Sequence, residues 1–356
     1  MPVSSEGKMK AKKHQKASLQ KDVRLGIVLL AILALLFGLL LVKIDSTLSL
    51  TITSFFAFVV FVSPYVLAGN PMLLKILRED FHAKPSRVWF FAAILWSAVQ
   101  LYAILSGQFL FIHALKTGIW LGIATVLVRF LRQFKVPSAL DYILVLLLWL
   151  PIEIGTLQGV SIPPVQGVLD PMTIVALLVL IYAYLVVRQF DVGFSYRLSG
   201  EDVRVVILDF IVFFFIAIIV GMLTGFLSIT DRMPSLGDLI SRFAAIFFFI
   251  ALPEELLFRG VIFKVLEQQF KGQKRAVAKA MVVSSVIFGL AHINNPVAPF
   301  IKLNLGSTLF NIPWVYILLA TVAGFFYCFV FIRTKKITAA AAIHLLVDWV
   351  WYAFFD

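Results

Sequence analysis

The chain has 356 residues, of which 61% are hydrophobic and 14% are charged, and 35 of them are phenylalanine. Soluble domains use charged residues for roughly 25% of their length, so this composition excludes an ordinary soluble protein and indicates an integral membrane protein. The formal charge of +12 does not indicate a nucleic-acid partner, because the basic residues are spread over short connections instead of gathering on one soluble face.

Apolar stretches long enough to cross a bilayer recur along the whole chain. A transmembrane helix needs about 20 mainly apolar residues. The sequence therefore predicts an all-α, polytopic membrane bundle of about eleven transmembrane helices. The predicted spans cover residues 25–42, 48–68, 88–106, 109–128, 139–158, 172–187, 205–228, 239–258, 280–293, 313–332 and 337–355.

The basic residues predict how this bundle is oriented. Residues 1–24 are rich in Lys, and most of the 31 Lys and Arg residues fall on connections on the same side of the predicted spans. Basic loops are typical of the cytoplasmic side, so we expect a cytoplasmic N-terminus and an external C-terminus. We expect residues 1–24 to form a mobile basic tail that is attracted to anionic lipid.

A polar connection at residues 190–204 separates six earlier spans from five later ones. We therefore predict an N-terminal transmembrane region at 25–204, for which the sequence indicates no role, and a second region at 205–356. The ionisable residues of the predicted spans concentrate in the second region, after about residue 240. The single cysteine, Cys328, lies in an apolar span, which excludes an internal disulfide and a cysteine-based zinc site.

The stretch ALPEELLFRG places two glutamates and an arginine inside an apolar helix. An ionisable side chain at mid-bilayer costs at least about 2.5–3.5 kcal/mol, so its presence suggests a function. Glu255 and Arg259 are four residues apart and can form an ion pair on one helix face. Glu254 points about 140° away from that arginine and lacks a local partner, as suits a general base. Pro253 is expected to kink this helix, which continues to about residue 270.

Two later helices carry further polar side chains in pairs four residues apart. Phe288 and His292 share one face, and His344 and Asp348 share another. Measured along each helix from its cytoplasmic end, these residues and Glu254 lie about 12–24 Å deep at 1.5 Å per residue. The three helices can therefore bring these side chains to similar levels and build one site.

The three segments resemble the motifs of a known family, the CAAX protease and bacteriocin-processing family, also called the Abi family of intramembrane endopeptidases. Its motifs EExxxR, FxxxH and HxxxN correspond to EELLFR at 254–259, FGLAH at 288–292 and HLLVD at 344–348. The resemblance covers residues 240–356 and is closest to the type II CAAX prenyl endopeptidases. The three motifs follow in order on separate helices, which makes the resemblance specific.

The resemblance implies hydrolysis of a peptide bond by a water molecule that a glutamate activates, with no cofactor. Carried over residue by residue, Glu254 is the base and His292 helps to hold the water. His344 and residue 348 form the oxyanion hole. The residues with supporting roles are Glu255, Arg259 and Phe288. The implied substrate is a peptide or a lipidated protein in the membrane, which the sequence does not specify further.

The chain departs from the family pattern at Asp348, where the pattern most often has asparagine. An ionised carboxylate only accepts hydrogen bonds and repels an oxyanion. Asp348 can donate if burial keeps it protonated. Alternatively, it can accept a hydrogen bond from His344 and orient that imidazole as the donor.

Three other functions are compatible with the same residues. Glu254, His292 and His344 can be the ligands of a zinc-dependent intramembrane protease, although no HExxH motif is present. Intramembrane charges can line the path of a transporter or channel. A non-catalytic immunity or scaffold protein is a further alternative, because Asp348 departs from the family pattern. In every case we expect a multi-pass protein in contact with the lipid bilayer, in a prokaryotic plasma membrane.

Overall fold

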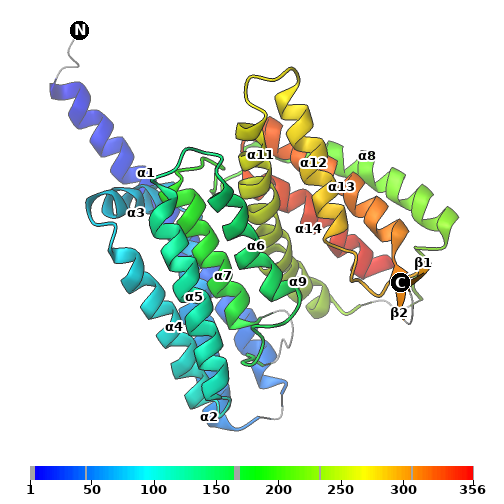
Figure 1. The fold of residues 1–356 in the computed structure, drawn as a ribbon, viewed down its shortest axis with the longest axis horizontal. Coiled ribbons are helices and arrows are strands. Elements are labelled where there is room, and N and C mark those ends of the chain that lie inside the picture. Colours follow the sequence, from blue (N-terminus) through cyan, green and yellow to red (C-terminus); the bar gives the residue numbers. More distant parts are fainter. Residues whose placement is uncertain (1–4, 45, 164–168, 232–233, 306–307, 356) are drawn as a thin grey trace. The chain divides into compact units, whose positions relative to one another are not determined.

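The computed structural model describes residues 5–44, 46–163, 169–231, 234–305 and 308–355. Helices form most of this structure (Figure 1). The chain divides into two compact units, Met1–Tyr196 and Arg197–Asp356, and the division falls inside the polar connection at 190–204.

Unit 1 is helical throughout its regular structure. Its elements are α1 (Ser5–Val42), α2 (Leu48–Ala68), α3 (Pro71–Ala83), α4 (Arg87–Leu105), α5 (Phe111–Leu131), α6 (Ala139–Glu153), α7 (Pro171–Leu180) and the π-helical segment η1 (Ile181–Val187). Helix α1 begins at Ser5, so most of the segment predicted as a mobile tail is helical. Asn70 and Asp170 cap α3 and α7, and a proline that needs no hydrogen-bond acceptor follows each cap.

Unit 2 combines helices with one β-hairpin. Its elements are α8 (Gly200–Thr224), α9 (Leu236–Ile246), η2 (Phe247–Ala251), α10 (Leu252–Glu255), η3 (Leu256–Phe263), α11 (Lys264–Gln269), α12 (Ala276–Leu290), β1 (Ile301–Leu305), β2 (Thr308–Ile312), α13 (Trp314–Thr334) and α14 (Ile337–Phe354). The hairpin is antiparallel and pairs Ile301 with Ile312 and Leu303 with Phe310. The described residues are otherwise mainly helical, as the all-α prediction expected, but that prediction treated this short segment between two spans as a connection and missed the hairpin.

Seven helices among the described residues are long and apolar enough to cross a membrane, as expected for a multi-pass membrane protein. They are Val23–Val42, Leu48–Ala68, Arg87–Leu105, Phe111–Leu131, Gly200–Thr224, Trp314–Thr334 and Ile337–Phe354. Each of the eleven predicted spans overlaps a helix, but α6 and α12 are only 15 residues long. The number of eleven spans and the cytoplasmic N-terminus therefore stay predictions.

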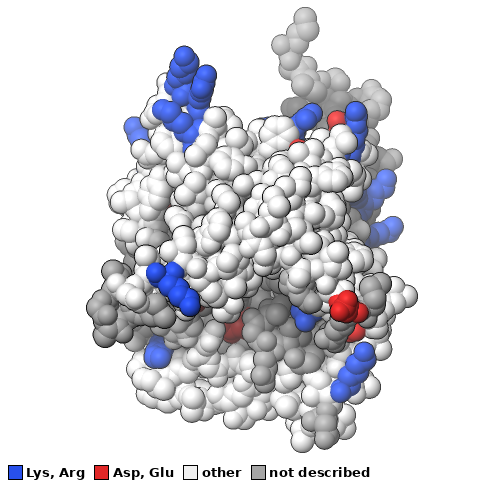
Figure 2. All heavy atoms as spheres, turned by 90° about the vertical axis from the view of Figure 1, so that its right-hand side faces the viewer, with Lys and Arg blue, Asp and Glu red and all other residues white. Residues whose placement is uncertain are grey.

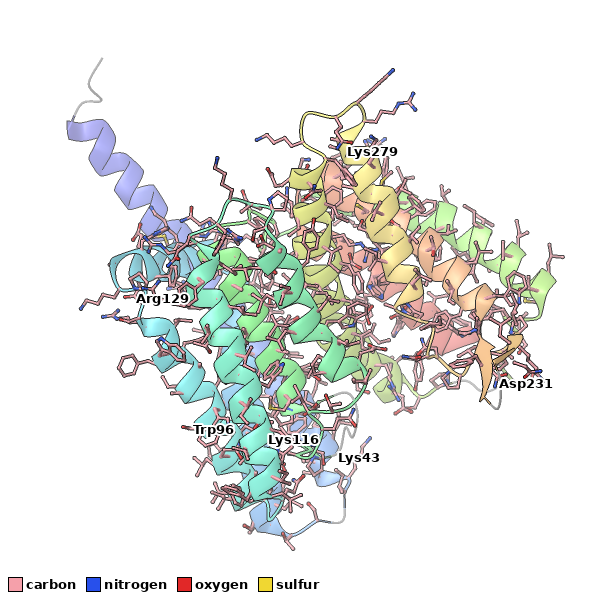
Figure 3. All side chains as sticks on the ribbon, viewed as in Figure 1. Lys43, Trp96, Lys116, Arg129, Asp231 and Lys279 are labelled. Carbon is pink, nitrogen blue, oxygen red and sulfur yellow. The ribbon has the colours of Figure 1, made fainter. Side chains whose placement is uncertain are left out.

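Several charged side chains lie towards the ends of the helices. In unit 1, Lys43 and Lys116 lie towards one end and Arg129 lies towards the other (Figure 3). On the face drawn in Figure 2, most of the central surface is uncharged, and Lys and Arg side chains lie near the top, along the right edge and in the lower part. A largely uncharged central surface is what contact with a hydrocarbon layer favours.

The helix that carries the two glutamates is continuous from Leu236 to Gln269, as α9, η2, α10, η3 and α11. Pro253 lies in α10, between the two π-helical segments. A proline inside a helix cannot donate to the preceding turn, and local π-helical pairing re-satisfies the freed backbone groups. Two π-helical segments therefore flank the proline that was expected to kink the helix, and the end at Gln269 agrees with the predicted end near residue 270.

Two glycines allow close packing where α12 crosses α13 and η3. A Cβ atom at Gly289 would lie 1.9 Å from Oγ1 of Thr321, and one at Gly324 would lie 3.1 Å from Nη2 of Arg259. Small residues let membrane helices approach each other closely. Helix α14 in turn packs against η2 and α10. This packing brings α10, the end of α12, and α14 together.

Candidate active site

The ion pair predicted from the four-residue spacing is present. Nη1 of Arg259 donates to Oε1 of Glu255 over 2.8 Å, and both side chains are fully buried. Nη2 of Arg259 donates to the carbonyl oxygen of Gly324 on α13 over 3.0 Å. The guanidinium also lies over the Phe288 ring, 4.3 Å from its centroid, in a cation–π contact. Arg259 therefore joins η3 to α12 and α13.

Glu255 also holds the first of the two histidines. Its Oε1 atom lies 3.0 Å from Nδ1 of His344 on α14. A carboxylate that already accepts from Arg259 can only accept again, so Nδ1 of His344 carries the proton and donates. This contact fixes the orientation of the imidazole and turns its other nitrogen, Nε2, away from Glu255. Glu255 thus orients His344, a contact that the sequence did not indicate.

Glu254 points to the other side of its helix, because adjacent helical residues are about 100° apart. Its Oε2 atom lies 3.9 Å from Nε2 of His344, which is too long for a direct hydrogen bond. Oε2 is buried and has no hydrogen-bond partner among the described residues. Glu254 and Glu255 therefore contact opposite nitrogens of one imidazole, and Glu254 keeps an acceptor free.

Asp348 lies one turn beyond His344 on α14. Its Oδ2 atom is 3.4 Å from Nε2 of the histidine, at the outer limit of a hydrogen bond. The Asp348 side chain is 29% exposed, against 4% for that of His344. The carboxylate is thus placed to accept from His344, which is one of the two roles that the sequence left open.

His292 follows the last turn of α12. Nδ1 of its ring lies 2.8 Å from the carbonyl oxygen of Phe288, four residues earlier. A carbonyl oxygen only accepts, so Nδ1 donates and, in the neutral ring, Nε2 is an acceptor. The ring also packs against Phe288 and Tyr316, with centroid distances of 4.9 and 5.0 Å. Both the hydrogen bond and the packing restrict the rotation of this imidazole.

The structure brings the four candidate catalytic residues around one cavity of about 140 Å³. Glu254, His292, His344 and Asp348 line it, whereas Glu255 and Arg259 lie behind this layer. The rest of the wall is mainly apolar. It includes Phe210, Phe213, Phe214, Phe226, Ala217, Ala320, Ala323 and Trp351. Water-sized groups can therefore meet the polar residues in surroundings that are otherwise apolar.

Two tyrosines in the cavity wall, Tyr316 and Tyr327, were not predicted. The Tyr327 ring stacks on the His344 imidazole, with centroids 4.6 Å apart and planes at 19°. Both tyrosines belong to α13, which carries none of the three motifs, and their neighbours in the sequence are apolar. The only feature of the sequence that could have identified them is a hydroxyl group inside an apolar span. Tyrosines with a purely packing role share this feature.

The zinc alternative requires three or more side chains that are arranged around one metal ion. Among the residues that the structure describes, no group of three or more His, Cys, Asp and Glu side chains is arranged to hold a metal ion. The zinc alternative, with Glu254, His292 and His344 as ligands, therefore stays a prediction for an experiment.

Comparison with protein families supports the assignment made from the motifs. Residues 236–350 match the family model described as type II CAAX prenyl endopeptidase Rce1-like. Comparisons with curated proteins and with solved structures found no match. The matched residues run from α9 into α14 and include all three motifs. The predicted resemblance is thus confirmed: residues 236–350 carry the sequence pattern of the Rce1-like type II CAAX prenyl endopeptidases, a family of proteases.

Proposed function

We propose that the protein is an intramembrane endopeptidase in which Glu254 activates the water that hydrolyses a peptide bond. One observation carries this proposal: four polar side chains from three apolar helices line a single cavity. Burying such groups in a membrane costs free energy, so their presence suggests a function. Preorganised polar groups stabilise a transient charge most strongly in a low-dielectric site. The family match supports the same reaction class.

In the proposed reaction, Glu254 accepts a proton from water, and the hydroxide attacks the carbonyl carbon of the substrate. The carbonyl oxygen becomes an oxyanion. The C–N bond then breaks as the leaving nitrogen takes the proton from Glu254, which restores the carboxylate. The unpartnered Oε2 of Glu254 suits this role, because an acceptor without an internal donor is available to water.

The two histidines have different tasks in this mechanism. With Nδ1 bonded to the Phe288 carbonyl, His292 offers Nε2 as an acceptor for the second proton of the water. With Nδ1 bonded to Glu255, His344 directs Nε2 towards Glu254 and Asp348. When the His344 ring carries both protons, the Nε2 proton that Asp348 accepts over 3.4 Å in the free protein is shared with the oxyanion.

The apolar cavity wall supports a substrate whose cleavage site is also apolar. We propose a peptide or the lipidated C-terminus of a protein, with CAAX processing as the form that the family match favours. The many apolar helices support a multi-pass location, for which we propose a prokaryotic plasma membrane with the N-terminus in the cytoplasm.

The test uses the full chain, purified and reconstituted in lipid vesicles, with a quenched fluorescent peptide that ends in a farnesylated CAAX sequence. We expect Glu254→Gln to lower kcat by about 10²- to 10⁴-fold, as for the loss of a general base. The matched control is Glu267→Gln, because Glu267 pairs with Lys264 outside the cavity. A comparison of membrane peptides from cells with the unchanged protein and with Glu254→Gln identifies substrates beyond CAAX peptides.

Three outcomes would favour another function. Zinc in the purified protein, together with loss of cleavage by a chelator, would indicate a metalloprotease. A cellular phenotype that Glu254→Gln leaves unchanged would indicate a scaffold or immunity protein. Transport without any cleavage product would indicate a transporter.

A further inference from the structure

Asp348 creates a shortage of hydrogen-bond donors in the cavity. The oxyanion of the proposed reaction needs donors, and the family pattern has an asparagine amide where this chain has a carboxylate. The 3.4 Å contact with Nε2 of His344 places Asp348 as an acceptor. Two hydroxyl groups remain in the cavity wall, on Tyr316 and Tyr327, and their surroundings differ.

Tyr327 is deeply buried in the cavity wall. Its ring is 2% exposed and lies flat on His344, and the guanidinium of Arg259 is 5.2 Å from its centroid. These two contacts explain the ring as a support for His344 and Arg259. A purely structural role therefore accounts for Tyr327.

Tyr316 lies in the first turn of α13, on the side of the cavity formed by His292. Its ring meets His292 at 5.0 Å and 62°, and Trp351 at 5.4 Å and 89°. Tyr316 lines the cavity together with Glu254 and Asp348, and its hydroxyl has the side chain of Asn295 as a hydrogen-bond partner. An amide N–H of Asn295 can donate to this hydroxyl, which leaves the O–H of Tyr316 able to donate. The ring is held by aromatic packing in the wall of the cavity that would surround a scissile bond.

The geometry points to Tyr316 as a further catalytic residue, whose hydroxyl donates a hydrogen bond to the oxyanion and supplies the donor that Asp348 does not provide. This inference rests on the proposed endopeptidase function. No proton is transferred, because the phenol keeps its hydrogen throughout and only the strength of the hydrogen bond changes. A neutral hydroxyl in an apolar site is an effective oxyanion donor, since it adds no charge that must be neutralised in the free enzyme.

The experiment compares Tyr316→Phe in two backgrounds, the unchanged chain and Asp348→Asn, with the vesicle assay described above. Phenylalanine keeps the ring packing and removes only the hydroxyl. We expect kcat to fall by about 10- to 100-fold in the unchanged chain, with KM changed less than about threefold, as for a donor used mainly in the transition state. In the Asp348→Asn background, where an amide is restored, we expect a loss below about threefold.

The control is Tyr352→Phe, because Tyr352 lies on α14 outside the cavity and contacts Arg242. Its kcat should be unchanged, and thermal unfolding in detergent should show that all variants remain folded. Glu254-dependent cleavage that Tyr316→Phe leaves intact would overturn this inference alone. Equal losses in both backgrounds would also overturn it, because the hydroxyl would not substitute for the amide. Absence of Glu254-dependent cleavage would overturn the proposed function, and the inference with it.

Discussion

Among the described residues, an arginine–carboxylate pair is buried in each unit, and the remaining hydrogen bonds of the two pairs differ. In unit 1, Arg188 binds both carboxylate oxygens of Asp141, with Nε–Oδ1 at 2.7 Å and Nη2–Oδ2 at 2.6 Å. The backbone N–H and the hydroxyl of Ser138 both donate to Oδ2 over 2.8 Å. The pair connects the start of α6 to the end of η1. All of these contacts are made by residues at these two helix ends.

In unit 2, the corresponding pair is only partly satisfied. Arg259 binds one oxygen of Glu255, and that oxygen also accepts from His344. The other carboxylate oxygen and Nε of Arg259 have no hydrogen-bond partner among the described residues. A fully satisfied pair can only hold helices together, whereas the pair in unit 2 also orients an imidazole. Burial alone therefore does not identify a functional charge. In unit 2, the additional contact of Glu255 with His344 does.

The largest expected effect comes from breaking the fully hydrogen-bonded pair of unit 1, Arg188 with Asp141. Arg188→Ala leaves Asp141 buried without its counter-ion, which typically costs about 3–5 kcal/mol of unfolding free energy. Denaturant titration in detergent micelles measures this loss. The control is Arg204→Ala, because Arg204 forms an exposed pair with Glu201 and should change stability little. A loss at Arg188 no larger than that of the control would show that unit 1 does not depend on this pair.

The same conservative substitution, arginine to lysine, distinguishes the roles of Arg188 and Arg259. Lysine keeps the positive charge but loses the planar fork that binds two acceptors. We expect Arg188→Lys to lower stability by about 1.5–3 kcal/mol, because charged hydrogen bonds are lost, and to leave kcat unchanged. We expect Arg259→Lys to lower kcat by about tenfold, because Glu255 then orients His344 less well.

The two measurements are kcat in vesicles and unfolding free energy in micelles, made on both variants. If both variants lost stability and neither lost activity, the Glu255 pair would be as purely structural as the one in unit 1. Neither buried arginine would then have a role in catalysis.

The sequence predicted the elements of this fold better than their contacts. The predicted span at 48–68 coincides with α2, because a long apolar run between polar connections leaves little choice of boundary. The Glu255–Arg259 pair followed from helical spacing alone. The π-helical segments around Pro253 could not be predicted, because their hydrogen bonds depend on how neighbouring helices pack. The hairpin was missed because its short strands resemble a connection between two spans.

The candidate site shows the same limit. The three motifs contain the four candidate catalytic residues that line the cavity, since the spacing within each motif places its residues on a shared helix face. The Glu255–His344 contact joins residues 89 positions apart, and no local pattern encodes it. Tyr316 likewise enters the site only because α13 packs between α8, α12 and α14. Contacts between helices were therefore what the sequence alone could not provide.

The smallest expected effect is that of Asp348→Asn, at the position where the site of unit 2 departs from the family pattern. Asparagine has the same shape, can accept from His344 through its oxygen, and can donate to the oxyanion through its amide. We therefore expect Asp348→Asn to keep most of the activity, with kcat within about threefold of the unchanged chain. Asp348→Ala removes the acceptor 3.4 Å from Nε2 of His344, so we expect it to lose most of the activity. The vesicle assay compares both variants with thermal unfolding as the check on folding. Equal losses in the two variants would mean that the negative charge itself is needed, and that Asp348 acts through electrostatics on His344.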